Sequence, residues 1–360
     1  MSAPTSLPLH EFHQSLGASF TALNSAELVG DYGDARAEYK ALYESAGVLD
    51  LSFRSRICLT GVDRARFLHG QVTNDVKKLR AGEGCYAALT TAKGKMQSDL
   101  NIFCLQDELL LDFEPGRTAP VTQRLEKYIV ADDVQVVDVA PHYGLLSVQG
   151  PNAEAVVRTL ALFATVPSAA LASAKISNAT LGEIYLVNHA RLASHGFDLF
   201  VPLAALGTVA DQLITAAKAT GGLACGWNAF EIARVEAGIP RFGADMDETH
   251  IASECGIEAR AISYTKGCYI GQEVLNRIHS IGHVNRALCR LTFAAELRTP
   301  PAPGAKLFQT DKEVGHITSA VVSPRQNCVV ALGYVRREAN AVGTNLLLRA
   351  DSGEITATIG

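Results

Sequence analysis

Hydrophobic and polar residues alternate with two different periods along the chain up to residue 240. Runs in which apolar residues recur every three or four positions predict helices, and runs in which every second residue is apolar predict strands. Residues 161–174, rich in Ala, Ser and Pro, are expected to be a connector. The expected helices cover residues 9–29, 35–45, 64–71, 119–128, 153–163, 206–220 and 227–236. The expected strands cover residues 56–60, 85–90, 96–105, 108–113, 143–149, 183–189 and 197–202.

The pattern changes after Arg286, where short β-rich runs alternate with Pro, Gly, Asp and Asn. This spacing predicts a small antiparallel barrel or sandwich. Mixed helices and strands followed by an all-β tail indicate an α+β body with a C-terminal β-domain. The β-rich runs cover residues 288–293, 306–308, 314–322, 328–335, 345–349 and 354–359.

Length and composition narrow the class of protein. The chain has 360 residues, enough for two or three domains that each bury a core. Hydrophobic residues make up 48% and charged residues 19%, which is typical of soluble globular proteins. The net charge of −5 counts against broad, charge-driven nucleic-acid binding, although it is compatible with a local basic patch.

Segments that direct a protein to a membrane or out of the cell are not apparent in the sequence. No stretch has the length and apolarity of a membrane span. Residues 1–8 lack the basic and apolar regions of a secretory signal, and the arginines of a mitochondrial transit peptide are also lacking. The eight cysteines form no Cys-x-x-Cys pair, which favours reduced thiols over a disulfide framework. A cytoplasmic location is therefore expected.

Cys268 has the most informative surroundings of any residue in the chain. It lies between Gly267 and Gly271, two positions after Lys266, and a helix is expected to begin just after it. Positive charge and a helix N-terminus both favour the reactive thiolate. A free cysteine in a tight turn is more commonly a small buried hydrophobe. The spacing by itself leaves both interpretations open.

Familiar catalytic and metal-binding patterns are missing. The sequence has no Walker A loop, Gly-x-Gly-x-x-Gly, His-Glu-x-x-His or Gly-x-Ser-x-Gly pattern. Cys268, His279, His283 and Cys289 lie close in sequence, but Gly282 separates the histidines and no second ligand flanks either cysteine. We therefore expect no metal.

A group of basic residues follows the cysteine. Arg277, Arg286 and Arg290 could bind a polyanionic ligand tail, because guanidinium groups pair bidentately with carboxylates. A solvated helix end is an equally good explanation. An RNA-binding module is a third hypothesis, which the overall acidity disfavours; it would use residues 277–290 together with Lys77, Lys78 and Arg80.

Two further polar positions are candidates for ligand contact. Asp99 lies in an apolar strand, where a carboxylate needs a partner, so it faces either a polar cavity or solvent. Arg234 ends a predicted helix, and the irregular run after Gly238 contains more arginines and acids. Such loops often bind ligands, although an internal salt bridge is the commoner outcome.

The segment 266–273 resembles the K-G-C-[YF]-x-G-Q-E signature of YgfZ-type tetrahydrofolate-binding proteins. Those proteins share their fold with the glycine-cleavage T-protein, an aminomethyltransferase. The resemblance covers nearly the whole chain. It extends to residues 47–52, 67–76, 148–151 and 234–248.

The resemblance implies a T-protein-like α+β fold, a ring of domains around a central folate cavity, with a C-terminal antiparallel β-barrel. The expected domains are residues 1–140, 141–280 and 281–360. The implied function is a folate-binding accessory protein in assembly or repair of iron–sulfur proteins, with tRNA modification supported indirectly. The implied ligand is tetrahydrofolate or a derivative, and the partners are iron–sulfur client or assembly proteins, without membrane or DNA. The resemblance does not fix a reaction.

Three departures separate this chain from the T-protein branch. T-protein has the pattern Lys-x-Asp-Phe-x-Gly-x-Glu, and this chain carries Cys268 and Tyr269 in place of its Asp-Phe. T-protein has paired aspartates where this chain has Ser98-Asp99. Its Gly-Glu-Asp-Gly-[FY]-Glu stretch, whose first glutamate recognises the pterin, is matched by residues 193–198, which lack that carboxylate. Tetrahydrofolate-dependent aminomethyl transfer is therefore the alternative function.

The resemblance also suggests site residues. Cys268 would be the working thiol. The implied folate contacts are Asp99, Arg234, Lys266, Tyr269, Gln272, Glu273 and Arg277.

Overall fold

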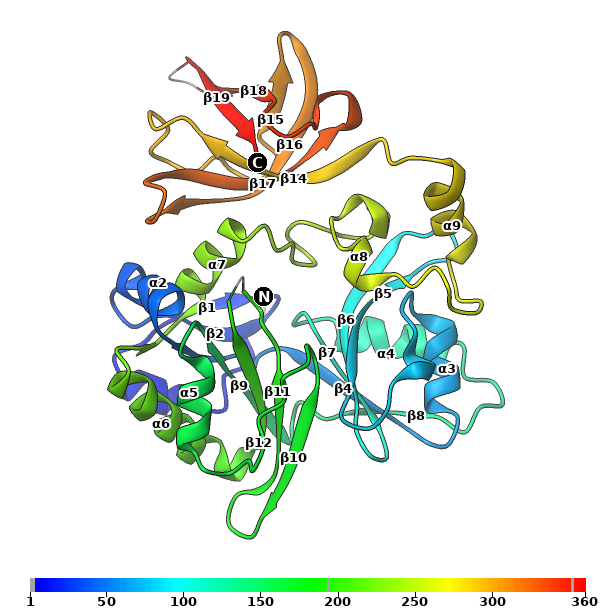
Figure 1. The fold of residues 1–360 in the computed structure, drawn as a ribbon, viewed down its shortest axis with the longest axis vertical. Helices are drawn as coiled ribbons and strands as arrows, with labels where there is room; N and C mark the ends of the chain where they lie inside the picture. The colour runs from blue at the N-terminus through cyan, green and yellow to red at the C-terminus, as the bar shows by residue number, and fades with distance from the viewer. Residues whose placement is uncertain (1–3, 193, 351–352) are drawn as a thin grey trace. The chain divides into compact units, whose positions relative to one another are not determined.

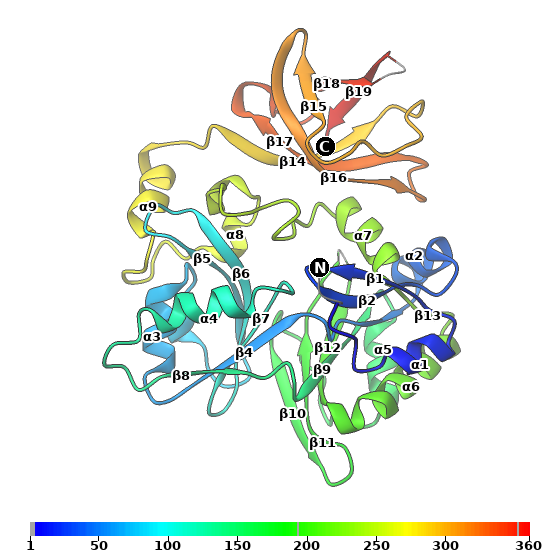
Figure 2. The same ribbon diagram turned by 180° about the vertical axis from the view of Figure 1, so that it is seen from behind.

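The computed structural model describes residues 4–192, 194–350 and 353–360 (Figure 1, Figure 2). The chain forms two compact units. The first contains residues 1–69, 75–86 and 100–233, and the second contains residues 70–74, 87–99 and 234–360. The division into residues 1–140, 141–280 and 281–360 stays a prediction.

The first unit contains a six-stranded sheet that is antiparallel except at one edge, where β13 runs parallel to β3. Helices α5 (Ala153–Thr159) and α6 (Leu203–Ala219) lie together beside this sheet in both views (Figure 1, Figure 2). Leu206, Val209 and Leu213 recur at helical spacing on α6 and are fully buried in the core against the sheet. The strand order is β10 (Ser173–Asn178), β11 (Gly182–Asn188), β12 (Gly196–Pro202), β9 (Tyr143–Gln149), β3 (Gly47–Asp50) and β13 (Leu223–Ala224).

A five-stranded sheet packs against the first through a second apolar cluster. Phe103 and Phe200 come from the two sheets, and their ring centroids lie 5.7 Å apart. β5 and β6 contribute residues to both units. The strand order is β5 (Gly84–Thr90), β6 (Met96–Cys104), β7 (Leu109–Phe113), β4 (Ser55–Thr60) and β8 (Gln135–Asp138).

The second unit ends in a closed barrel, which confirms the predicted β-domain and makes it a barrel rather than a sandwich. Leu291, Ile317, Val335 and Leu346 are buried inside it. All strand pairs in the barrel are antiparallel. The order around the barrel is β14 (Arg286–Phe293), β17 (Cys328–Arg336), β16 (Lys312–Ser323), β15 (Lys306–Gln309), β18 (Asn345–Ala350) and β19 (Gly353–Ile359).

Further short helices lie between the strands along the chain. Asp34 caps α2, where its carboxylate accepts hydrogen bonds from the N–H groups of Arg36 and Ala37 at 3.1 and 3.0 Å. Within the described ranges, no helix combines the length and apolarity needed to cross a membrane. The remaining helices are α1 (His10–Ser15), α2 (Ala35–Glu44), α3 (Arg64–Gln71), η1 (Val76–Lys78), α4 (Thr118–Glu126), α7 (Trp227–Glu236), η2 (Ala252–Glu254), α8 (Glu258–Ala261), α9 (Gln272–Ile281) and η3 (Arg337–Ala339).

The predicted helix over 9–29 is wrong beyond its first turns. Only α1 is helical, and it is followed by a hairpin of β1 (Ser19–Leu23) and β2 (Ala26–Asp31). Asn24 and Ser25 form the two-residue turn with φ of 49° and 64°. Asparagine tolerates this left-handed conformation, which matches the twist of a hairpin. The expected connector 161–174 likewise runs into β10, which the low apolar content of its sequence concealed.

Candidate functional site

The cysteine-bearing segment 266–273 lies wholly in the second unit and leads directly into α9. Gly271 precedes α9 with a φ of +93°, a conformation that favours glycine. A Cβ atom at this position would lie 2.6 Å from the Thr90 hydroxyl oxygen and 2.7 Å from the Thr91 carbonyl oxygen. The glycine therefore sets both the direction of the chain and its close approach to the end of β5.

Lys266 anchors the other end of this segment. Its side chain is buried, and its ammonium donates to the carbonyl oxygens of Val72 and Asn74 at 2.7 and 2.8 Å. The same ammonium lies 4.7 Å from the centroid of the Tyr269 ring. Through these contacts Lys266 positions the segment. The contact of Lys266 with folate stays a prediction.

Of the eight cysteines in the chain, Cys268 is exposed and the other seven are buried or half-buried. Burial raises the pKa of the Cys255 and Cys289 thiols to about 12 and about 11, which leaves them protonated at neutral pH. A reactive thiol needs solvent access and an available thiolate. Cys268 is therefore accessible to solvent and not a buried structural thiol, and its role as the working thiol stays a prediction.

The remaining predicted residues of this segment differ in exposure. Tyr269 is buried, and burial raises its pKa to about 12. Among the described residues its hydroxyl group has no hydrogen-bond partner. Gln272 is half-buried, whereas Glu273 and Arg277 are exposed and lie four residues apart on one face of α9.

Arg234 has protein partners in the second unit. Its guanidinium pairs with Asp245 and donates to the Ser319 hydroxyl at 2.8 Å. The other oxygen of Asp245 accepts from Thr318 at 2.6 Å. These contacts join the end of α7 to barrel strand β16. A contact of Arg234 with folate stays a prediction, and its observed role is to position these elements.

Ser98 and Asp99 lie on β6 and project to opposite faces of the strand. Ser98 is fully buried, and Asp99 is half-buried. The Ser98 hydroxyl donates to the carbonyl oxygen of Asp99 at 3.0 Å. The position at which T-protein carries its first aspartate therefore has no charge in this chain.

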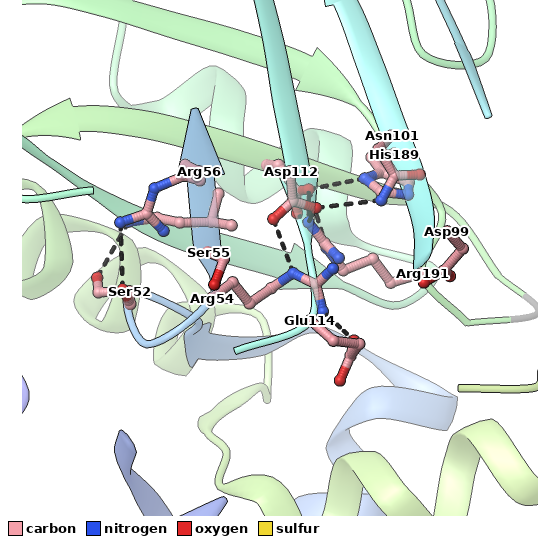
Figure 3. A network of polar contacts seen from close by, with 12 residues as sticks. Ser52, Arg54, Ser55, Arg56, Asp99, Asn101, Asp112, Glu114, His189 and Arg191 are labelled. Carbon is pink, nitrogen blue, oxygen red and sulfur yellow. Dashed lines mark hydrogen bonds and ion pairs between the residues drawn. The ribbon is translucent and has the colours of Figure 1, made fainter. Parts of the chain in front are cut away.

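A buried ionic network in the first unit was not predicted from the sequence (Figure 3). Asp112 on β7 is its centre. Arg54 Nε donates to one carboxylate oxygen of Asp112 at 2.7 Å, and Arg54 Nη1 donates to Glu114 at 2.5 Å. Arg191 Nη2 and Asn101 Nδ2 approach the other oxygen of Asp112 at 2.9 and 3.1 Å.

Arg191 extends the network to Asp198 on β12. Their closest atoms lie 2.7 Å apart, and His189 Nδ1 lies 2.8 Å from the same carboxylate. Burial alone would raise the pKa of Asp112 and of Asp198, but the neighbouring arginines outweigh it and hold both carboxyls below their usual range. Burial, followed by the charge of Arg191, lowers the pKa of His189.

One sequence signal could have revealed this network. Asp112 and Asp198 each interrupt an apolar strand, and a carboxylate in such a position needs a buried partner. The strand pattern indicates that Asp112 and Asp198 have buried partners, but it does not identify those partners.

A polar groove of about 860 Å³ lies in the second unit. Arg286, from the predicted basic segment, lines it together with Arg336 and Arg337. Arg286 pairs with Glu254 at 3.3 Å and stacks over Tyr334, with 4.9 Å between its guanidinium carbon and the ring centroid. The groove has cations and carboxylates on its walls.

Metal-ligating side chains do not converge within the described ranges. No group of three His, Cys, Asp or Glu residues there is arranged to bind a metal ion. His279 stacks on Tyr264, with ring centroids 3.7 Å apart.

Comparison with known proteins identifies the family. Residues 9–266 match the GCVT N-terminal domain, and residues 286–360 match the glycine cleavage T-protein C-terminal barrel domain. The chain belongs to the glycine-cleavage T-protein family. Its mixed α/β fold with a closed six-stranded barrel is the fold of this family.

Several relatives align over almost the entire chain. An aminomethyltransferase of Streptomyces avermitilis is 26% identical over 95% of this chain and 92% of its own length. A putative chloroplastic transferase of Arabidopsis thaliana is 24% identical over 97% of this chain and 79% of its own length. The crystal structure of the glycine cleavage system aminomethyltransferase T from Bartonella henselae superposes with a TM-score of 0.88 at 22% identity, covering 99% and 97% of the two chains. The structural similarity shows a shared fold.

Proposed function

We propose that this protein binds tetrahydrofolate or a derivative of it and handles one-carbon groups. The observation that carries this proposal is the match to both T-protein domains, which together account for residues 9–266 and 286–360. The likeness is therefore to a whole T-protein and not to an isolated module.

The side chains of the second unit include groups suited to a folate. The half-buried carboxylate of Asp99 can accept hydrogen bonds from the amino-pyrimidine edge of a pterin. The buried hydroxyl of Tyr269, which lacks a hydrogen-bond partner among the described residues, offers a second polar contact. The exposed Arg277 and the groove residue Arg286 suit the carboxylates of a glutamate tail.

Two more specific functions are candidates. The comparisons support tetrahydrofolate-dependent aminomethyl transfer better than an accessory role for iron–sulfur proteins. Relatives named aminomethyltransferase align over nearly the whole chain at 26–27% identity. The folate would supply the acceptor for the one-carbon unit. Ser98, where T-protein has an aspartate, weighs against this function.

An accessory role for iron–sulfur proteins is the second candidate, and a specific observation favours it. Cys268 is exposed on a segment held by Lys266 and Gly271, so an accessible thiol is presented from a backbone that is fixed at both ends. In this proposal the thiol serves iron–sulfur client or assembly proteins in the cytoplasm, and tRNA modification depends on it indirectly.

Titration of the purified protein with tetrahydrofolate tests the shared part of both functions. We expect Asp99→Ala to weaken binding by at least about tenfold, which corresponds to about 1.4 kcal/mol. Asp211→Ala removes an exposed carboxylate from α6 and is the matched control. Absence of saturable folate binding by the wild type would overturn the proposal.

Two assays then distinguish aminomethyl transfer from the accessory role for iron–sulfur proteins. Robust formation of methylene-tetrahydrofolate with aminomethylated lipoyl carrier protein would establish the transferase. Loss of iron–sulfur enzyme activity in cells that carry Cys268→Ser, with folate affinity unchanged within about twofold, would establish the accessory role. Cys85→Ser is the matched control, because Cys85 is half-buried and lies elsewhere in the chain.

A further inference from the structure

A small cavity of about 100 Å³ lies within the first unit. Its deep walls are the buried side chains of Cys58, Leu110 and Phe200, which come from β4, β7 and β12. Ligand sites for drug-sized molecules usually exceed about 300 Å³. Any occupant of this cavity is therefore very small.

Arg56 lines this cavity and is the most unusual charged residue of the unit. Its side chain is 1% exposed. Arg56 Nη2 donates to the carbonyl oxygens of Ser52 and Tyr143 at 3.1 and 2.7 Å. Within the part of the chain that the structure describes, Nε and Nη1 are buried without any hydrogen-bond partner.

Among the residues that the structure describes, Arg56 forms no ion pair, although the charges of Asp112 and Asp50 favour its charged form. Figure 3 shows it directed toward Ser52 and away from the Asp112 network. Burial lowers its pKa to about 10, so it still carries its charge at neutral pH. A buried cation with two unused donors is costly unless an acceptor satisfies them.

The charged residues that line the cavity differ in exposure. Arg56 is buried, whereas the acidic residues Glu108 and Glu183 are half-exposed. Glu183 is paired with Lys175 at 2.6 Å, so its charge is compensated. Glu108 adds a second negative charge to the cavity lining. After burial, its charge and its hydrogen bond to the Cys58 thiol raise the pKa of that thiol.

We propose that this cavity binds a small zwitterion, with its carboxylate on Arg56 and its ammonium group near Glu108. A carboxylate oxygen can accept a charge-assisted hydrogen bond from Nη1 or from Nε, which lie on opposite edges of the guanidinium. A simple anion would be repelled by Glu108, and a simple cation would be repelled by Arg56. An amino acid with a minimal side chain satisfies both charges within the available volume. The site is independent of the proposed folate function.

Ordered water is the alternative occupant, because about 100 Å³ has room for several water molecules. Water would satisfy the two nitrogens without any preference for a charged solute. The two occupants therefore differ in whether solutes compete for the site and in whether Glu108 affects that competition.

Ligand-observed NMR with glycine, acetate and methylammonium on the full-length protein tests the site. We expect saturable glycine binding in the millimolar range and at least about fivefold weaker acetate and methylammonium binding. Arg56→Gln should weaken glycine at least about tenfold. Glu108→Gln should weaken glycine and bring the affinities of glycine and acetate together. Glu126→Gln, which alters an exposed residue of α4, should change neither.

The result that overturns the proposal is equally definite. If glycine does not saturate up to about 50 mM, the cavity holds only water. If glycine binds but Glu108→Gln leaves the glycine-to-acetate ratio unchanged, the site does not recognise an ammonium group. Glu108→Gln carries this test even if Arg56→Gln fails to fold, since Glu108 is half-exposed.

Discussion

The Lys266 ammonium lies 2.7 Å from the carbonyl oxygen of Val72, a residue 194 positions earlier in the chain. This contact and the one to Asn74 fix the start of the cysteine-bearing segment. Gly271 fixes its end at the first turn of α9. Cys268 is therefore presented on a backbone that is held at both sides.

Replacing Lys266 by methionine should destabilise the protein by about 2–4 kcal/mol, because a buried and a partly buried carbonyl group lose this donor. Urea denaturation measures the change. Lys93→Met alters an exposed lysine and is expected to change the free energy of unfolding by less than about 0.5 kcal/mol. Equal effects of the two substitutions would contradict the anchoring role of Lys266.

Gly271→Ala should cost at least about 2 kcal/mol more than Gly243→Ala. Both glycines have positive φ, at +93° and +83°. A Cβ atom at Gly271 would meet Thr90 and Thr91 below 3 Å, whereas at Gly243 no atom lies within 4 Å. The difference in unfolding free energy between the two variants therefore measures the cost of the steric clash at Gly271. Similar values would show that the segment relaxes to admit a side chain.

Cys268 should be the fastest thiol to react with a disulfide reagent in the native protein. The other cysteines are buried or half-buried, and burial raises the pKa of Cys255 and Cys289. Stopped-flow titration should show one fast thiol per chain, and Cys268→Ser should remove that phase alone. A fast phase that persists in this variant would identify a different accessible thiol.

Asp112→Asn should destabilise the protein by about 3–5 kcal/mol, because Arg54 and Arg191 would remain buried with one carboxylate fewer. Chemical denaturation at pH 7 measures this loss. Asp63→Asn removes an ion-paired aspartate whose partner Arg66 is mostly exposed, and it should cost less than about 1 kcal/mol. A small effect at Asp112 would mean that water enters and solvates the two arginines.

Acidification should weaken the fold in two stages. The pKa of His189 is lowered in the folded protein, so the unfolded chain binds this proton more readily and stability falls as pH drops through about 6.5. The pKa values of Asp112 and Asp198 are also lowered, so their contribution is present above the ordinary aspartate pKa of about 4 and is lost as pH falls through their folded values.

The first of these stages can be assigned by mutation. His189→Gln should reduce the slope of unfolding free energy against pH between about pH 7 and 5. His195→Gln changes an exposed histidine and should leave the slope as it is. An unchanged slope in His189→Gln would assign the acid sensitivity to other histidines.

Local sequence signals predicted the elements that depend on neighbouring residues. The barrel strands, α6 and α9 were expected because period and turn residues are both read within a short window. The same approach missed the hairpin after α1, since Asn24 and Ser25 are weaker turn signals than glycine.

The sequence by itself determined the family, the strand content of the barrel and the segment that carries Cys268, because motif and periodicity are properties of contiguous residues. Only the tertiary structure decided that Lys266 is an anchor, that Arg234 is held by Asp245 and Ser319, and that Arg56 lines a cavity with unused donors. The physical reason is distance along the chain. The partners of Arg234 and Lys266 lie between 11 and 194 residues away along the chain, and periodicity carries no information about which partners folding brings together.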